Sequence, residues 1–153
     1  MYLNGDENML NDLRGLWEAL NLYYRERSSY FKLEYCEMTF EKRKAELLKK
    51  NKLGKMRVDL AVDKATGQKI GYCVSSLDKV LTGEIDSIFM DSKYRRQGIG
   101  RELMQKALTW LDSVGAKKKF VSVGVGNEQV YGFYAKFGFL PRRTILEQKN
   151  QLE

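Results

Sequence analysis

The sequence predicts an α/β fold built on a mixed sheet, and two stretches of the chain carry this prediction. Residues 56–62 alternate apolar and polar positions, residues 69–74 are rich in β-forming residues, and the turn sequence DKATGQ lies between them. Together they predict an antiparallel hairpin. Further on, a strand over 84–90, a helix over 101–114 and a β-rich run over 119–125 predict a parallel pair with a right-handed crossover. A sheet with both kinds of pairing follows.

The remaining elements follow from apolar spacing. A first helix is expected over residues 9–27, because its apolar positions recur at helical intervals. These positions are Leu13, Leu16, Trp17, Leu20 and Tyr24. A strongly charged helix is expected over 42–50, a short helix over 128–136 and a last strand over 140–148. Few residues precede the first helix, which leaves little room for an initial strand.

The composition is that of a compact domain with a core. The chain has 153 residues, of which 43% are hydrophobic, so we expect one domain over residues 1–153. The apolar runs are far shorter than a membrane span, and no basic segment followed by an apolar stretch begins the chain. We therefore expect a cytoplasmic protein with no membrane partner.

The cysteine, histidine and charge content limits the kinds of binding site and reaction that the chain can have. Cys36 and Cys73 have no CxxC spacing and the chain has no histidine, which argues against a disulfide scaffold and a common zinc site. Ser-His and Cys-His nucleophile pairs are excluded for the same reason, and no metal is expected. The net charge of +7 favours an anionic partner, which can be nucleic acid, a membrane surface or a phosphorylated cofactor.

A glycine-containing loop joins the predicted strand over 84–90 to the helix that follows it. The first N–H groups of a helix have no intrahelical acceptor, and the helix dipole adds about half a positive charge there. Such a junction binds phosphate. Gly98 and Gly100 leave the backbone accessible, and the arginines on either side add positive charge. The spacing matches neither a Walker loop nor a dinucleotide fingerprint.

The loop Arg95-Arg96-Gln97-Gly98-Ile99-Gly100 resembles the R/Q-x-x-G-x-G/A loop of the GNAT-type N-acetyltransferases. Downstream, FVSVGVGNEQVYGFYAKFGF is similar to the strand and helix that follow in that family, with Asn127 just after the strand and Tyr134 four residues before Gly138. The resemblance covers the chain from about Gly83 onward. It implies a GNAT-like mixed, mostly antiparallel sheet with helices on both faces, here with shortened terminal strands.

The resemblance also implies a cofactor and a reaction. The family transfers the acetyl group of acetyl-coenzyme A directly to a primary amine, here of a small molecule or peptide. Backbone groups of Ile88 and Met90 would pair with the pantetheine arm. The loop would hold the pyrophosphate and Asn127 would hydrogen-bond the pantetheine. Asn127 can also cap the helix that follows it, either in place of that contact or together with it. The loop residues are Arg95, Arg96, Gln97, Gly98, Ile99, Gly100 and Arg101.

Two carboxylates are candidates for the base that deprotonates the amine. Glu84 and Asp86 lie two residues apart, so we expect them on one face of the strand with Ile88 and Met90. The resemblance favours Glu84, since some family members place a glutamate base at this separation from the loop. Asp86 is the second choice, and a water chain or a simple lysine ion pair are the alternatives.

Tyr134 resembles the tyrosine with which the family protonates the leaving thiolate. Burial for packing is the alternative for Tyr134, because its helix carries an apolar stripe, and Tyr131 is a nearby competitor. The aromatic stretch over 23–35 is expected to line the acceptor pocket. Two other functions stay open: a non-catalytic acyl-coenzyme A binding or sensing module, and a basic nucleic-acid-binding protein, which only the charge supports. A homodimer in which a second copy completes the sheet edge is also an option.

Overall fold

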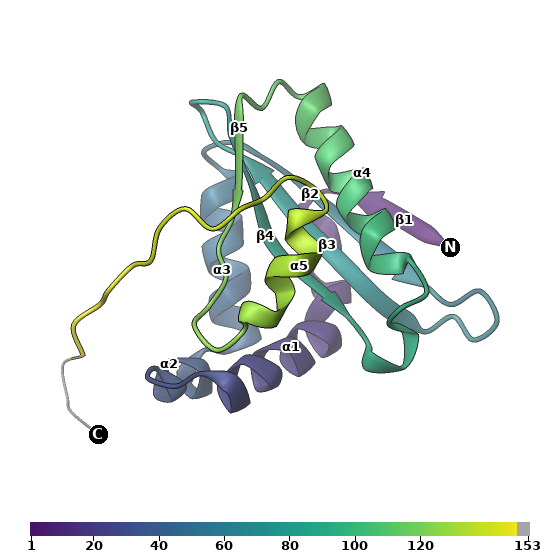
Figure 1. Cartoon of the computed structure of the whole chain (residues 1–153). Coiled ribbons are helices and arrows are strands. Elements are labelled where there is room, and N and C mark those ends of the chain that lie inside the picture. The colour runs from purple at the N-terminus through teal and green to yellow at the C-terminus, as the bar shows by residue number, and fades with distance from the viewer. Residues whose placement is uncertain (150–153) are drawn as a thin grey trace.

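The computed structural model describes residues 1–149. In chain order the elements are β1 (Tyr2–Gly5), the 3-10 helix η1 (Glu7–Leu13), α1 (Arg14–Arg27), α2 (Lys32–Glu37), α3 (Phe40–Asn51), β2 (Lys55–Val62), β3 (Lys69–Leu77), β4 (Thr82–Met90), η2 (Ser92–Tyr94), α4 (Ile99–Ser113), β5 (Lys118–Val121), η3 (Glu128–Val130) and α5 (Tyr131–Ala135). Figure 1 shows their arrangement.

The five strands form one mixed sheet in the order β1-β2-β3-β4-β5. The first three pairings are antiparallel, and β4 pairs with β5 in parallel across the crossover through α4. The predicted fold class, the hairpin and the parallel pair are therefore confirmed. The outer strands β1 and β5 have four residues each, so the terminal strands are short. An initial strand, β1, does form in the few residues that precede η1.

Helices cover both faces of the sheet (Figure 1). On one face α1 and α3 bury an apolar stripe against β2 and β3, and on the other α4 and α5 cover a second core. The stripe predicted for the first helix is confirmed, although its first part is the 3-10 helix η1. The buried residues that α4 contributes are Leu103, Met104, Ala107 and Leu111. The sheet therefore separates two cores, and β4 has one face in each.

The predicted strand over residues 140–148 is wrong. These residues have no regular structure and run away from the sheet (Figure 1). Pro141 has no N–H to donate, and two charged residues follow it. Among residues 1–149 no further strand pairs with the outer edge of β5. Leu140, Ile145 and Leu146 are consequently 76%, 78% and 92% exposed. The helix α2 lies between the first two predicted helices, where the sequence predicted no element.

Candidate functional site

The glycine loop presents a row of free backbone donors at the start of α4. Arg96 and Gly98 both adopt left-handed backbone, with φ of 61° and 80°. Glu102 donates its amide to the Gly98 carbonyl at 3.0 Å. Within the described residues, none of the amides over 96–101 has an acceptor. Successive N–H groups in such a turn form a concave site for anions, and the dipole of α4 reinforces it.

The three arginines of the loop do not share one orientation. Arg95 turns back to β4, where its Nε donates to the Met90 carbonyl at 3.2 Å. Its guanidinium lies 5.7 Å from the centre of the Tyr23 ring and 5.8 Å from that of Phe89. There it lines a groove of about 850 Å³ between α1 and the end of β4. Arg96 and Arg101 are exposed beside the free amides.

The strands β4 and β5 part beside this loop. They pair only from Thr82 to Ile85, so the rest of β4 has no strand partner on that side among the described residues. Asp91 donates its amide to the Ile70 carbonyl of β3 at 2.9 Å. Because backbone groups alternate between the two edges of a strand, the amides of Ile88 and Met90 face the gap. An extended ligand can add to this open edge as a further strand.

A β-bulge interrupts β4 at Asp86. Ile85 and Ser87 pair with consecutive residues of β3, which leaves Asp86 as an extra residue between them. A bulge shifts the alternation of side chains between the two faces by one residue. Asp86 and Ser87 therefore lie on the same face, where the Ser87 hydroxyl is 2.8 Å from that of Tyr72.

The bulge overturns one predicted arrangement. Glu84 and Asp86 do share a face of β4, the face covered by α3. Ile88 and Met90 pack instead in the core under α4. The prediction that all four side chains share a face is therefore wrong, because it assumed regular alternation. The bulge instead places the carboxylates on one face and the apolar side chains on the other.

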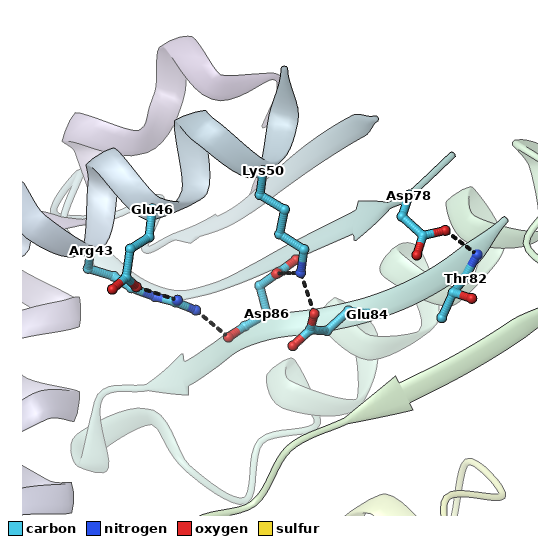
Figure 2. A network of polar contacts seen from close by, with 7 residues as sticks. All are labelled: Arg43, Glu46, Lys50, Asp78, Thr82, Glu84 and Asp86. Atoms are coloured by element: carbon cyan, nitrogen blue, oxygen red, sulfur yellow. Dashed lines mark hydrogen bonds and ion pairs between the residues drawn. The ribbon is translucent and has the colours of Figure 1, made fainter. Parts of the chain in front are cut away.

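Lys50 of α3 joins the two carboxylates (Figure 2). Its Nζ lies 2.5 Å from Asp86 Oδ1 and also donates to Glu84 Oε2. Arg43 lies two helical turns earlier and donates its Nη2 to the Asp86 carbonyl at 3.0 Å. Arg43, Leu47 and Lys50 follow i, i+4, i+7 spacing, so one face of α3 directs both cations at β4.

Burial and the neighbouring carboxylates shift the pKa of Lys50 in opposite directions. Burial alone lowers the pKa of the Lys50 ammonium, but the charges and hydrogen bonds of Asp86 and Glu84 raise the pKa above its usual value. The Asp86 side chain is only 2% exposed, and its Oδ2 is buried without a hydrogen-bond partner in the described chain. The Ser76 hydroxyl, on the residue opposite Glu84 in β3, is likewise buried and unpartnered. The site therefore contains two buried oxygen atoms, Asp86 Oδ2 and Ser76 Oγ, to which no group of the described residues forms a hydrogen bond.

Tyr134 is the one buried residue of α5, at 8% exposed. Its ring packs edge-on against Phe133 at 5.3 Å and Phe139 at 6.3 Å between centroids. Burial raises the pKa of this phenol, and Tyr24 of α1 and Cys73 of β3 add to the rise. Tyr131, the competitor, is half exposed on the same helix.

We expect the protein to lose stability in alkali because of its buried phenols. Burial raises the pKa of Tyr24 from 10.0 to about 12, and it also raises the pKa of Tyr72 and Tyr134. A raised pKa in the folded state stabilises the fold below the unfolded pKa, and this contribution is lost as pH rises through the folded one. The free energy of unfolding, measured by urea titration, should fall from about pH 10 to about pH 12. Tyr24→Phe should flatten the decline, and constant stability over that interval would contradict the assignment.

Asn127 belongs to a loop that closes on α1. The Asn127 Oδ1 accepts from Gln129 Nε2 at 2.5 Å, and Gln129 Nε2 also donates to the Tyr23 hydroxyl at 2.6 Å. Arg27 lies over the Tyr23 ring at 3.4 Å. Asn127 occupies the N-cap position of η3 but makes no side-chain hydrogen bond to that helix, so the predicted side-chain cap does not form. The adjacent Gly126, with φ of 100°, lies so close to α1 that a Cβ would be 2.1 Å from the Arg27 carbonyl oxygen.

Two residues of this site, Gln129 and Lys50, were not predicted from the sequence. Gln129 ties Asn127 to Tyr23, which lines the groove beside Arg95 together with Arg27. Lys50 lay within a basic run, and its i+7 spacing from Arg43 on the buried face was the available signal. Within the aromatic stretch over 23–35, Tyr24 and Tyr35 lie 5.9 Å apart, and the role of this stretch in an acceptor pocket stays a prediction.

Comparison with known proteins agrees with this geometry. The model of the Acetyltransferase (GNAT) family matches residues 16–139, so the chain belongs to the GNAT family. An uncharacterized N-acetyltransferase of Methanocaldococcus jannaschii, MJ1207, is 29% identical over 90 residues, which are 55% of this chain and 40% of that protein. The peptidyl-lysine N-acetyltransferase YjaB of Salmonella typhimurium is 41% identical over 61 residues, 39% of each chain. The matches thus span about two fifths of each curated relative.

The fold extends the similarity over nearly the whole chain. The aminoglycoside N-acetyltransferase AAC(6')-Iy, solved in complex with CoA, superposes with a TM-score of 0.71 at 16% identity, covering 99% of this chain and 95% of that one. At this identity the likeness concerns the fold. Within the described residues, no helix has the length and apolar character needed to cross a bilayer, and no three metal-binding side chains cluster.

Proposed function

We propose that this protein is an N-acetyltransferase that transfers the acetyl group of acetyl-coenzyme A directly to a primary amine of a small molecule or peptide. The observation that carries the proposal is the row of free amides over 96–101 beside the open edge of β4. A diphosphate and a pantetheine arm need these two features next to each other. Family membership supports the same assignment.

The cofactor would lie from the glycine loop to the gap between β4 and β5. The amides of Gln97, Gly98, Ile99 and Gly100, with Arg96 and Arg101, would hold the pyrophosphate. Ile88 and Met90 would pair with the pantetheine arm and Asn127 would donate to it. Arg95 contacts Met90 and Tyr23 in this structure, so its part in binding would require it to turn toward the loop.

Glu84 is our proposed base, with Asp86 as the alternative, and Tyr134 is the proposed acid. Both carboxylates lie on the α3 face next to the point where β4 and β5 part. Their place beside Lys50 shows that an ammonium fits between them. The buried phenol of Tyr134 stays protonated at neutral pH, as an acid for a thiolate must.

The direct test of the function is a panel of amines and lysine peptides incubated with acetyl-coenzyme A, with release of free thiol as the readout. YjaB is named for peptidyl lysine and AAC(6')-Iy for aminoglycosides, so both acceptor types belong in the panel. Turnover of at least one amine is expected. Absence of both turnover and acetyl-coenzyme A binding would reject the assignment.

Removing either proposed proton-transfer group should lower kcat. We expect Tyr134→Phe and Glu84→Gln each to reduce kcat about 100-fold with little change in KM, since general acid or base catalysis typically contributes this much. Steady-state kinetics on the accepted amine would measure both. Tyr131→Phe is the matched control, because it removes a more exposed phenol of the same helix. Loss of kcat in the Tyr131 variant alone would move the acid to that residue.

We also propose a homodimer and a cytoplasmic location. The outer edge of β5 has no partner within residues 1–149, and the apolar residues of the following tail are exposed. The tail of a second copy could pair with this edge.

A cytoplasmic location is supported by Cys36, which is exposed and unpaired, as is usual for thiols in a reducing compartment.

The dimer predicts a specific change of mass. The double variant Ile145→Asp with Leu146→Asp should convert a dimer into a monomer, because it charges the apolar tail. Light scattering after size exclusion measures the mass. Leu53→Asp is the control, since Leu53 is also exposed but lies in the turn after α3. A monomeric parent protein would refute the dimer.

A further inference from the structure

The Lys50 side chain occupies the place that an acceptor amine would need. Its Nζ lies 2.5 Å from Asp86 Oδ1 and donates to Glu84 Oε2 (Figure 2). A base acts on an amine only within direct or one-water reach. If either carboxylate is the base of the proposed reaction, the substrate ammonium must come within this reach and therefore compete with the Lys50 ammonium for the same two carboxylates.

The same place is close to where the thioester would lie. Asp86 directly follows Ile85, the last residue of β4 that pairs with β5. The Ile88 amide, which faces the gap, is two residues further on, or about 7 Å along the strand. In the proposed function this gap holds the thioester. Lys50 comes from the last turn of α3, and its side chain is 37% exposed, so its four-carbon stem has room to turn toward the gap.

A proton acceptor is also in place. Asp86 is buried, and its Oδ2 has no hydrogen-bond partner in the described chain although its Oδ1 contacts Lys50. Asp86 Oδ1, which contacts the Lys50 ammonium, can take one of its protons. The amine, the base and the approach to the cofactor gap therefore come from this chain alone.

We propose that Lys50 is an internal acceptor, acetylated on Nζ by acetyl-coenzyme A bound to the same chain. This inference rests on the proposed function. The ammonium gives one proton to Asp86 or Glu84, and the nitrogen lone pair attacks the thioester carbonyl carbon. The C–S bond then breaks, the second amine proton is lost to solvent, and the thiolate takes a proton to leave as coenzyme A. The new amide carries no charge, so Glu84 and Asp86 lose their internal counter-ion.

The experiment is site-resolved acetylation of the purified full chain. The protein is incubated with acetyl-coenzyme A, digested, and each lysine followed by mass spectrometry over time. We expect Lys50 to be acetylated more than about tenfold faster than the exposed Lys49 and Lys52, because holding an amine beside the carbonyl raises its effective concentration. The first-order rate at Lys50 should not depend on protein concentration. Excess desulfo-coenzyme A should suppress acetylation of Lys50 and leave the other two unchanged.

Two variants sharpen the test. Lys49→Arg changes the neighbouring exposed lysine and should leave acetylation of Lys50 unaltered. Asp86→Asn, checked for folding by circular dichroism, should slow acetylation of Lys50 while that of Lys49 continues. Equal rates at Lys50 and Lys49, or no effect of desulfo-coenzyme A, would overturn the inference by showing only chemical acetylation of surface lysines.

The inference and the proposed function can fail separately. Calorimetry with acetyl-coenzyme A and the amine panel are run on the same preparation. Binding and amine turnover without modification of Lys50 would reject the internal acceptor alone. No binding and no turnover would reject the proposed function, and with it this inference.

Discussion

The variant Gly98→Asp should bind acetyl-coenzyme A about 1000-fold more weakly than the parent protein. The side chain would put a negative charge beside the free amides over 96–101, where the diphosphate is proposed to bind. Two unit charges about 4 Å apart near a protein surface repel by about 4 kcal/mol, which is roughly three orders of magnitude in affinity. Calorimetry measures the dissociation constant, and kcat/KM should fall in parallel.

Gly98→Asn is the matched control for charge. A Cβ at this position meets no atom within 4 Å, and asparagine and aspartate both tolerate the left-handed backbone that Gly98 adopts. The two variants should therefore unfold at similar temperatures, and the neutral one should lose much less affinity. Equal losses in both would show that the backbone of Gly98, and not an anion at the amides, controls binding.

The variant Gly126→Ala should lower the free energy of unfolding by about 4 kcal/mol. Part of the loss is strain, because φ of 100° costs an L-residue about 1–3 kcal/mol. The rest is overlap, since the new Cβ would lie 2.1 Å from the Arg27 carbonyl oxygen, and overpacking typically costs about 1–3 kcal/mol. Urea denaturation monitored by fluorescence measures the change. The loop must also move away from α1, so affinity for acetyl-coenzyme A should fall through Asn127.

Gly132→Ala is the control that shows whether the loss of stability is specific to position 126. Gly132 lies in α5 and needs no positive φ, and a Cβ added to it would meet no atom within 4 Å. Alanine in a helix is favoured over glycine by roughly 1 kcal/mol, so this variant should be as stable as the parent protein or more so. A Gly126 variant that matches it in stability would show that the loop does not need its contact with α1.

Much of the fold could be predicted from local patterns. The turn sequence DKATGQ predicted the β2–β3 hairpin, and the glycine loop marked the start of α4, because both depend on residues close together in the chain. The apolar stripe of α1 was visible for the same reason. Local patterns could not show whether residues 140–148 form a strand. Strand formation needs a partner, and the β-forming residues of that stretch do not provide one.

The candidate site was predictable to a lesser degree. The loop and Tyr134 stood out by their resemblance to a family, and their roles remain predictions. Nothing in the local sequence IDSIF indicates the β-bulge at Asp86. The faces of the side chains beyond the bulge were therefore assigned wrongly. The pairing of Lys50 with Glu84 and Asp86 joins residues more than 30 positions apart. The spacing of Arg43, Leu47 and Lys50 indicated a shared helix face, but the packing of α3 on the sheet determines which carboxylates Lys50 reaches.

The extra residue in β4 adds a carboxylate without changing the register of the strand. Ile85 and Ser87 pair with consecutive residues of β3, so deletion of Asp86 would leave regular alternation, with Glu84 and Ser87 still facing α3 and Ile85 and Ile88 still packed beneath α4. Such a deletion would leave Lys50 with Glu84 as its remaining partner on β4. The bulge thus lets one short strand present two acidic side chains to the same cation while its apolar side chains stay in the opposite core.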